Sequence, residues 1–71
     1  MENAFAKNLK ELRFEKGIGQ VELAKQIGVS KGIISLWEND KREPTLHYLI
    51  LLASYFGVSI DYLVGYERTE N

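Results

Sequence analysis

The sequence predicts a compact all-α domain of five helices, and three observations support this. Apolar residues recur at intervals of three and four, which is the spacing of one helix face and not of a strand. Glycines follow these apolar stretches, at the positions where helices commonly end. Serine or threonine, whose hydroxyl can cap a helix, precedes three of the stretches. With 71 residues, of which 45% are hydrophobic, the chain can bury one core.

The first helix is predicted at residues 3–16. Phe5, Leu9 and Leu12 recur at i, i+4 and i+7 and form its apolar face. Gly17 follows directly, in the usual position for a left-handed C-cap. The helix should therefore end at this glycine.

Residues 20–39 predict two short helices joined by a tight turn at residues 28–30, an arrangement called a helix-turn-helix. Gly19 is an acceptable N-cap for the first of them, although it has no side chain to bond the free amides. Ser30 can cap the second, which is predicted at residues 31–39 and is followed by Asp40, a residue type that accepts a left-handed backbone. The apolar positions are Leu23, Ala24 and Ile27 in the first helix and Ile34 and Trp37 in the second.

The fourth helix is predicted between a cap at Thr45 and a terminating Gly57. Ser59 caps a short fifth helix that runs through Val64. The domain should then span residues 1–65, followed by a polar tail at residues 66–71. The predicted core face of the fourth helix consists of Leu46, Leu49, Leu52, Ala53 and Phe56.

The charge is unevenly distributed along the chain. The net charge is -1, which by itself argues against a nucleic-acid partner. However, eight of the nine basic residues lie at or before Arg42, against six acidic ones, so this part carries +2 and the remainder -3. A basic face on an acidic body is therefore possible, and a helix held across the major groove of DNA can set several side chains against base edges.

The sequence lacks the parts of a catalytic or metal site. It has no cysteine, one histidine (His47), no glycine-rich phosphate loop and no cluster of carboxylates. We therefore expect no enzyme, no metal, no cofactor and no small-molecule substrate. The N-terminal region holds charged residues among scattered apolar ones, so it predicts neither a signal peptide nor a membrane span, and we expect a cytoplasmic location.

A set of residues from Leu12 to Gly65 falls at the usual spacings of a known family. The set is Gln20, Glu22-Leu23-Ala24, Gly28-Val29-Ser30, Ile34-Ser35, Trp37-Glu38, Lys41-Arg42, Pro44, Ala53, Phe56-Gly57-Val58-Ser59 and Asp61-Tyr62-Leu63. Through these residues most of the chain resembles the Cro/repressor-type helix-turn-helix family, also called the XRE family. The resemblance implies a small repressor-like transcription regulator of the kind that binds operator DNA as a dimer.

The resemblance implies that Lys31, Gly32, Ser35 and Leu36 contact bases. Lys31 can donate to guanine O6 or N7, whereas Leu36 can only pack on a thymine methyl group. Two alternatives stay open. Lys31 could be a solvated surface lysine, and Ile33 and Leu36, apolar where the family usually has polar or basic residues, could face protein instead of DNA. Both apolar side chains are expected to point away from the core.

The resemblance also implies DNA-backbone contacts by Gln20, Asn39, Lys41 and Arg42. Such contacts fix the register of the protein on the duplex without reading sequence. Gln20 could instead be only a first-turn residue of its helix. Acidic residues interleave the basic ones, and Asp40 stands where the family commonly has glycine, so we expect modest affinity and a shallow salt dependence.

Arg13 and Glu38 match a pair that forms an internal ion pair in this family. We therefore expect both to be structural and not to contact DNA directly. Trp37 should belong to the core, because an aromatic residue on an apolar helix face is usually buried.

The fourth helix carries a second apolar stripe nearly opposite its core face, which suggests a dimer interface. Alternatively, its tyrosines are single amphipathic surface residues and the last helix alone makes the dimer. The candidate interface residues are Tyr48, Leu51 and Tyr55 on the fourth helix and Ile60, Val64 and Tyr66 near the last one.

The sequence thus predicts a sequence-specific regulator, a repressor that occupies double-stranded operator DNA as a homodimer through the major groove. The alternative is a protein-interaction module on the same fold, such as an antitoxin or an antagonist of another regulator. Because few residues follow the fifth helix, we also expect no effector-binding domain in this chain.

Overall fold

The computed structural model describes residues 3–66 of the chain. Within this range the protein consists of five helices without a strand, so the predicted all-α, five-helix architecture is confirmed. Residues 67–71 of the predicted polar tail lie outside the described range. The helices are α1 (Phe5–Lys16), α2 (Gln20–Ile27), α3 (Lys31–Glu38), α4 (Leu46–Phe56) and α5 (Ile60–Val64).

The predicted hydroxyl caps are present. Ser30, Thr45 and Ser59 each accept a hydrogen bond from the backbone amide three residues ahead, at the start of α3, α4 and α5 respectively. These bonds satisfy amides that the helices themselves leave without a partner. The residue types at the helix starts therefore explain where three of the five helices begin.

Two predicted helix ends are off by one or two residues. α1 begins at Phe5 instead of Asn3, because the side-chain Oδ1 of Asn3 accepts a hydrogen bond from the Phe5 amide (2.9 Å) from outside the helix. α3 ends at Glu38, and Asn39 is its C-cap. Asp40 then adopts the left-handed backbone that the sequence analysis allowed for it (φ 59°), which turns the chain away from the helix axis.

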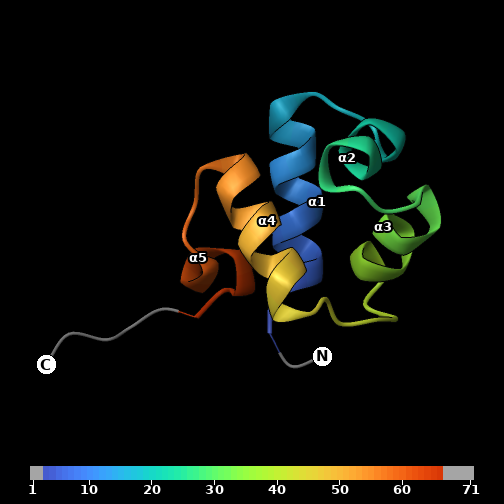
Figure 1. Cartoon of the computed structure of the whole chain (residues 1–71). Helices are drawn as coiled ribbons and strands as arrows, with labels where there is room; N and C mark the ends of the chain where they lie inside the picture. Colours follow the sequence, from blue (N-terminus) through green and yellow to red (C-terminus); the bar gives the residue numbers. More distant parts are fainter. Residues whose placement is uncertain (1–2, 67–71) are drawn as a thin grey trace, which may run out of the picture.

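The five helices surround one hydrophobic core. α1 packs against α3 and α5, α2 packs against α3 and α4, and α4 packs against α5, so no helix stands apart (Figure 1). Burial of these apolar side chains is the main source of stability in a domain of this size. The buried apolar residues are Phe5, Leu9, Leu12, Leu23, Ala24, Ile27, Ile34, Trp37, Leu52, Ala53 and Leu63.

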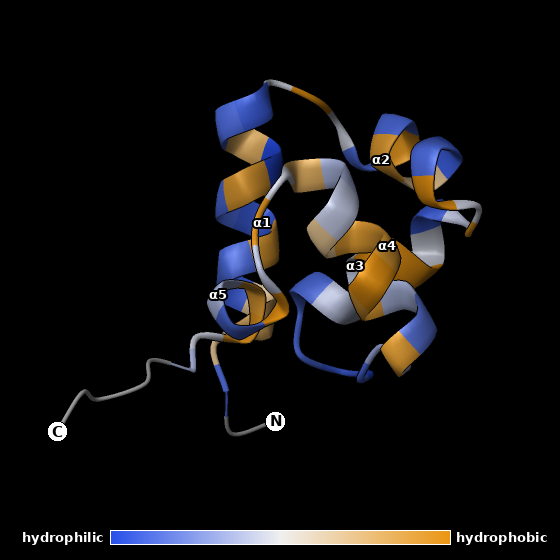
Figure 2. Cartoon of the chain, turned by 60° about the vertical axis from the view of Figure 1, so that its left-hand side comes forward, coloured by the Kyte–Doolittle hydropathy of each residue, from blue (hydrophilic) through white to orange (hydrophobic). Residues whose placement is uncertain are grey.

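The predicted core face of α4 is wrong at one end. Leu52 and Ala53 are buried, and Leu49 and Phe56 pack partly against the core, but Leu46 is 66% exposed. Leu46 shares its angular position with Ala53 but lies two turns earlier, at the very start of the helix. Spacing alone predicts the direction of a side chain and not whether a neighbour covers it. Figure 2, coloured by residue hydropathy, shows that α4 consists largely of apolar residues.

The first and last helices are joined by polar bonds as well as by packing. The amide of Ala4 donates to the carbonyl of Val64 (3.0 Å), and Asn8 Nδ2 donates to the carbonyls of Tyr62 (3.0 Å) and Leu63 (3.3 Å). Gly65 has a left-handed backbone (φ 77°), and a Cβ atom there would lie 2.5 Å from the Cβ of Ala4. The start of α1 therefore closes onto the end of α5, as Figure 1 shows.

Candidate nucleic-acid interface

α3 has one face fixed in the protein and one face exposed. Ile34 and Trp37 are almost fully buried on the inner face. Trp37 makes an edge-on contact with the ring of Phe5 (centroids 6.3 Å apart) and a tilted one with Tyr48 (5.5 Å). Aromatic contacts of this geometry stabilise packing beyond simple burial. α3 is therefore held by α1 and by α4, and its outer face remains available.

The outer face of α3 contains the four residues for which base contacts are predicted. Lys31 and Gly32 are exposed, Leu36 is 36% exposed, and Ser35 is half-buried. All four lie on one short helix whose opposite face is anchored, so a duplex could meet them together. The structure thus brings these side chains to one surface.

The turn between α2 and α3 sets the angle between the two helices. Gly28 takes a left-handed conformation (φ 88°), and its amide donates to the carbonyl of Ala24. Val29, which packs partly against the core, donates its amide to the same carbonyl. Ser30 then caps α3 through its hydroxyl oxygen. This compact turn ties the second helix of the pair rigidly to the first.

A bidentate ion pair connects α1 to α3. Arg13 Nε lies 2.6 Å from Glu38 Oε2, and Arg13 Nη2 lies 2.9 Å from Glu38 Oε1. Both residues are buried. The hydrogen bonds that the Arg13 guanidinium donates to the Glu38 carboxylate raise its pKa further above its already high ordinary value, against the opposing effect of burial. Arginine in such a pair stays charged at every physiological pH.

Two further polar groups join this ion pair. Arg13 Nη1 donates to the carbonyl of Ile18 (3.1 Å), in the loop between α1 and α2. Gln20 Nε2, at the first residue of α2, donates to Glu38 Oε1 (3.0 Å). Gln20 is half-buried and therefore not a free first-turn side chain. The Glu38 carboxylate is the meeting point of α1, α2 and α3, a feature that sequence spacing alone did not reveal.

The side chain of Asn39 is directed back toward its own helix. Asn39 Nδ2 donates to the carbonyl oxygen (2.9 Å) and to the hydroxyl (3.2 Å) of Ser35. A phosphate contact by this amide would have to share or replace these bonds. Lys41 and Arg42, which follow in the loop, are exposed, so they can contact a DNA phosphate without first breaking bonds within the protein.

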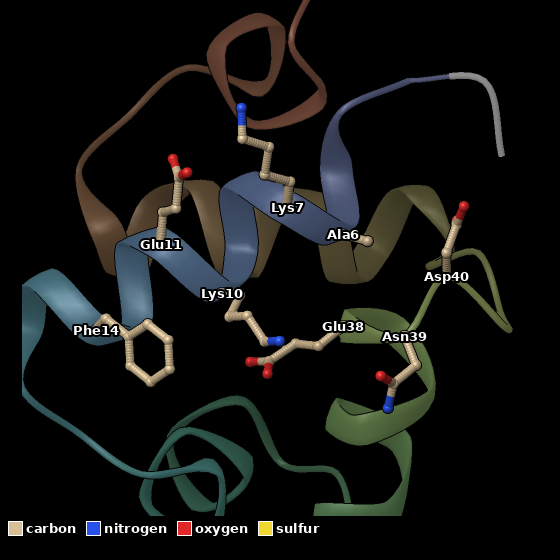
Figure 3. Close-up of a pocket in the computed structure, with 8 residues that line it drawn as sticks. All are labelled: Ala6, Lys7, Lys10, Glu11, Phe14, Glu38, Asn39 and Asp40. Atoms are coloured by element: carbon tan, nitrogen blue, oxygen red, sulfur yellow. The ribbon is translucent and has the colours of Figure 1, made fainter.

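A hollow of about 500 Å³ lies between α1 and the end of α3. Figure 3 shows Lys10 extending from α1 toward the Glu38 carboxylate, whereas Lys7 and Glu11 point to the other side of α1. Lys10 is not among the contact residues predicted from the sequence. No motif marks it, and only the packing of α1 against α3 brings it to the end of α3.

One expectation for α3 is wrong. Ile33 does not point fully away from the core but packs partly against it. It also lines a second hollow, of about 280 Å³, together with Trp37, Pro44 and Tyr48. The segment after α3 folds back over this side of the helix, which the periodicity of α3 could not indicate. Of the two unusual apolar residues, Leu36 is thus the more exposed.

Within residues 3–66, no helix is both long and apolar enough to cross a membrane. The same residues contain no group of three or more histidine, aspartate or glutamate side chains placed to hold a metal ion.

The chain is similar to known transcription regulators over most of its length. A helix-turn-helix family model matches residues 9–63. The HTH-type transcriptional activator BcrR of Enterococcus faecalis is 38% identical over 64 residues, which are 90% of this chain and 31% of BcrR. The chain therefore spans less than a third of that relative.

Solved structures agree with this match. A transcriptional regulator from Listeria innocua superposes with a TM-score of 0.89 and 33% identity, over 99% of this chain and 65% of the other. The P22 c2 repressor, solved in complex with a synthetic operator, gives 0.83 and 32%, over 89% of this chain and 96% of the other. The five-helix fold, the tight turn before α3 and the family match lead to one conclusion: this chain belongs to the helix-turn-helix family of transcription regulators, of the Cro/repressor (XRE) type.

Proposed function

We propose that this protein is a sequence-specific repressor that occupies operator DNA as a homodimer, with α3 in the major groove. The observation that carries the proposal is the two-sided character of α3. Its inner face is locked by Ile34 and Trp37, while its outer face exposes Lys31 and Leu36. A short helix held in this way can present side chains to base edges without being ordered first.

In this arrangement Lys31 leads into the groove. It is the first residue of α3, and the residues of a recognition helix that reach bases lie toward its N-terminal end. Its ammonium group donates to guanine O6 or N7, and Leu36, five residues later, packs on a thymine methyl group. Gly32 leaves room for close backbone approach, and the Ser35 hydroxyl adds a short polar contact. This set favours a site with both guanine and thymine.

The backbone contacts come from both sides of α3. Gln20 lies at the start of α2, where the amides of the first turn favour an anion. Lys41 and Arg42 follow α3, with Asn39 at its C-cap, and Lys10 adds a cation from α1. Phosphates neutralised by these cations give salt-dependent affinity, whereas Gln20 and Asn39 add contacts without releasing counterions.

The homodimer is proposed to form through the outer face of α4 and the residues near α5. Of the six predicted interface residues, Leu51 and Tyr66 are exposed, while Tyr48, Tyr55, Ile60 and Val64 are half-buried against their own core. The exposed apolar surface extends to three residues that the sequence analysis did not select, which are Leu46, Ile50 and Tyr62.

The composition of α4 supports this assignment. Between Leu46 and Phe56 the helix carries no Asp, Glu, Lys or Arg, although half of its surface is open. The centres of protein interfaces are depleted in charged residues in the same way. A two-fold dimer would present two copies of α3 to half-sites about one turn of the duplex apart. Such a regulator needs no catalytic step and works beside the DNA in the cytoplasm.

Selection of duplexes from a random double-stranded library by the purified chain tests the proposal. We expect a short motif with two-fold symmetry to be enriched. Lys31→Ala should weaken binding to the selected duplex about tenfold or more and relax one base position. Lys25→Ala is the matched control, because Lys25 is an exposed lysine in the last turn of α2, outside both the proposed DNA contacts and the proposed dimer interface, and should leave the motif unchanged.

Failure to enrich any motif would contradict the proposal. Capture of a defined protein partner by the same preparation would then favour the protein-interaction role that the sequence left open. Enrichment of a motif that Lys31→Ala binds as well as the unchanged chain would instead show that α3 is not the reading helix.

A further inference from the structure

The side-chain amide of Gln20 is held in one orientation. Its Nε2 donates to Glu38 Oε1 at 3.0 Å, and the same oxygen accepts from Arg13 Nη2 at 2.9 Å. A carboxylate is only an acceptor, so the nitrogen end of the amide must face it. The second N–H of Nε2 then remains as a donor at the first residue of α2.

The orientation matters because a phosphate oxygen also only accepts. If the amide rotated freely, its oxygen would face the phosphate in part of the population. Forming the hydrogen bond to the phosphate would then cost the entropy of ordering the amide. Arg13 adds to this order, because its Nη1 bond to the Ile18 carbonyl fixes the backbone two residues before Gln20. Glu38 from α3 and Arg13 from α1 thus both hold the start of α2.

We propose that Glu38 is a positioning residue for DNA-backbone binding: through the Glu38–Arg13 pair it orients the Gln20 amide so that one N–H is available to a phosphate. The inference rests on the DNA-binding function proposed above and deepens it. It assigns the buried carboxylate a role in recognition in addition to holding α1 against α3. The contact it supports is with the DNA backbone, so its loss weakens binding to every duplex alike.

A double-mutant cycle tests the coupling between the two residues. Gln20→Ala is compared in the unchanged chain and in the variant Arg13→Met/Glu38→Leu, which removes both charges together and leaves none stranded. In the unchanged chain Gln20→Ala should weaken binding to the selected duplex and to an unrelated duplex about tenfold each. In the double variant the same change should alter affinity less than twofold.

An equal loss in both backgrounds would overturn the proposal, because Gln20 would then bind without help from Glu38. Circular dichroism of the double variant establishes that it is folded before binding is measured. Should it not fold, the mobility of the Gln20 side-chain amide in the unchanged chain decides the matter.

The second measurement needs no DNA. In NMR spectra of the free protein, the side-chain ¹⁵N order parameter of Gln20 should be clearly higher than that of Gln26. Gln26 is the matched control, because its Nε2 donates to Glu22 Oε2 at 2.9 Å on an exposed helix surface. Equal mobility of the two amides would overturn the positioning role.

The two proposals can fail separately. A mobile Gln20 amide in a chain that still selects a DNA motif would refute the positioning of Gln20 and leave the repressor function standing. A rigid Gln20 amide in a chain that binds no duplex would refute the DNA-binding function and, with it, any role of Glu38 in phosphate contact.

Discussion

Arg13 on α1 and Glu38 on α3 meet side-on, with two nitrogens of the guanidinium on two oxygens of the carboxylate at 2.6 and 2.9 Å. The two residues are 25 positions apart in the chain, and both are buried. Because charges buried in this way are stable only as a pair, the contact ties the orientation of α3 to the integrity of α1.

Arg13→Ala should lower the free energy of unfolding by about 3–5 kcal/mol, because it leaves the Glu38 carboxylate buried without its partner. Urea denaturation followed by circular dichroism measures this change. Arg13→Met/Glu38→Leu is the control and should lie within about 2 kcal/mol of the unchanged chain, since no charge is stranded. A loss below about 1 kcal/mol for Arg13→Ala would show that solvent reaches the pair.

Gly65→Ala should destabilise the domain by about 3 kcal/mol, from a left-handed backbone and from crowding of Ala4. Gly57→Ala is a matched control, because Gly57 has a similar backbone (φ 69°) but nothing within 4 Å of the added Cβ. It should cost only about 1–2 kcal/mol. Thermal unfolding separates the two variants. Equal shifts in Tm would mean that Ala4 moves away from the added Cβ without a loss of stability.

Gly19→Ser should stabilise the protein by about 0.5–1 kcal/mol. The backbone of Gly19 is extended (φ −87°, ψ 175°), no atom lies within 4 Å of an added Cβ, and α2 has no side-chain cap. A serine hydroxyl would bond a free amide of the first turn and reduce the freedom of the unfolded chain. A rise in Tm of about 2–8 °C is expected, and a fall would mean that Gly19 needs a conformation which serine disfavours.

Lys41→Ala should reduce the slope of log K against log salt by about 0.9 for each protomer, because one phosphate contact no longer releases a counterion. Titration of a selected duplex over a series of salt concentrations measures the slope. Asn39→Ala is the neutral control: it should weaken binding and leave the slope unchanged. An unchanged slope for Lys41→Ala would remove this lysine from the backbone contacts.

Ile50→Glu should shift the dimer toward monomer in analytical ultracentrifugation, because it places a carboxylate in the proposed apolar interface. Ile50 is 50% exposed, so the change should not unfold the domain. Val21→Glu on α2 makes the same kind of substitution at similar exposure (54%) outside the proposed interface. Equal association of Ile50→Glu and the unchanged chain would exclude the outer face of α4.

Local signals in the sequence were sufficient for most of the fold. Gly17 and Gly57 end their helices in left-handed conformations, and Ser30, Thr45 and Ser59 begin theirs, because such caps depend on a few neighbouring residues. Helix spacing identified the buried faces of α1, α2 and α3. It could not show that Leu46 projects beyond its neighbours or that Ile33 is half-covered, since both depend on how the helices are placed.

The candidate site was predicted unevenly for the same reason. Lys31 and Leu36 were selected through the family resemblance, and because both lie on one helix, its periodicity could place them opposite Ile34 and Trp37; their contact with bases stays a prediction. The link from Gln20 to Glu38 joins residues 18 positions apart, and Lys10 reaches the end of α3 from another helix. Contacts of this kind arise only when three helices pack together, and no spacing rule along the chain encodes them.

The hydrogen bonds between the start of α1 and the end of α5 join residues 54 and 55 positions apart, so these two parts of the chain lie side by side. A short glycine linker could therefore connect residues 3 and 66, and new chain ends could be opened at the exposed turn around Gly57. Such a circular permutant would keep α2 and α3 untouched, and it would let a reporter be attached on a different side of the molecule.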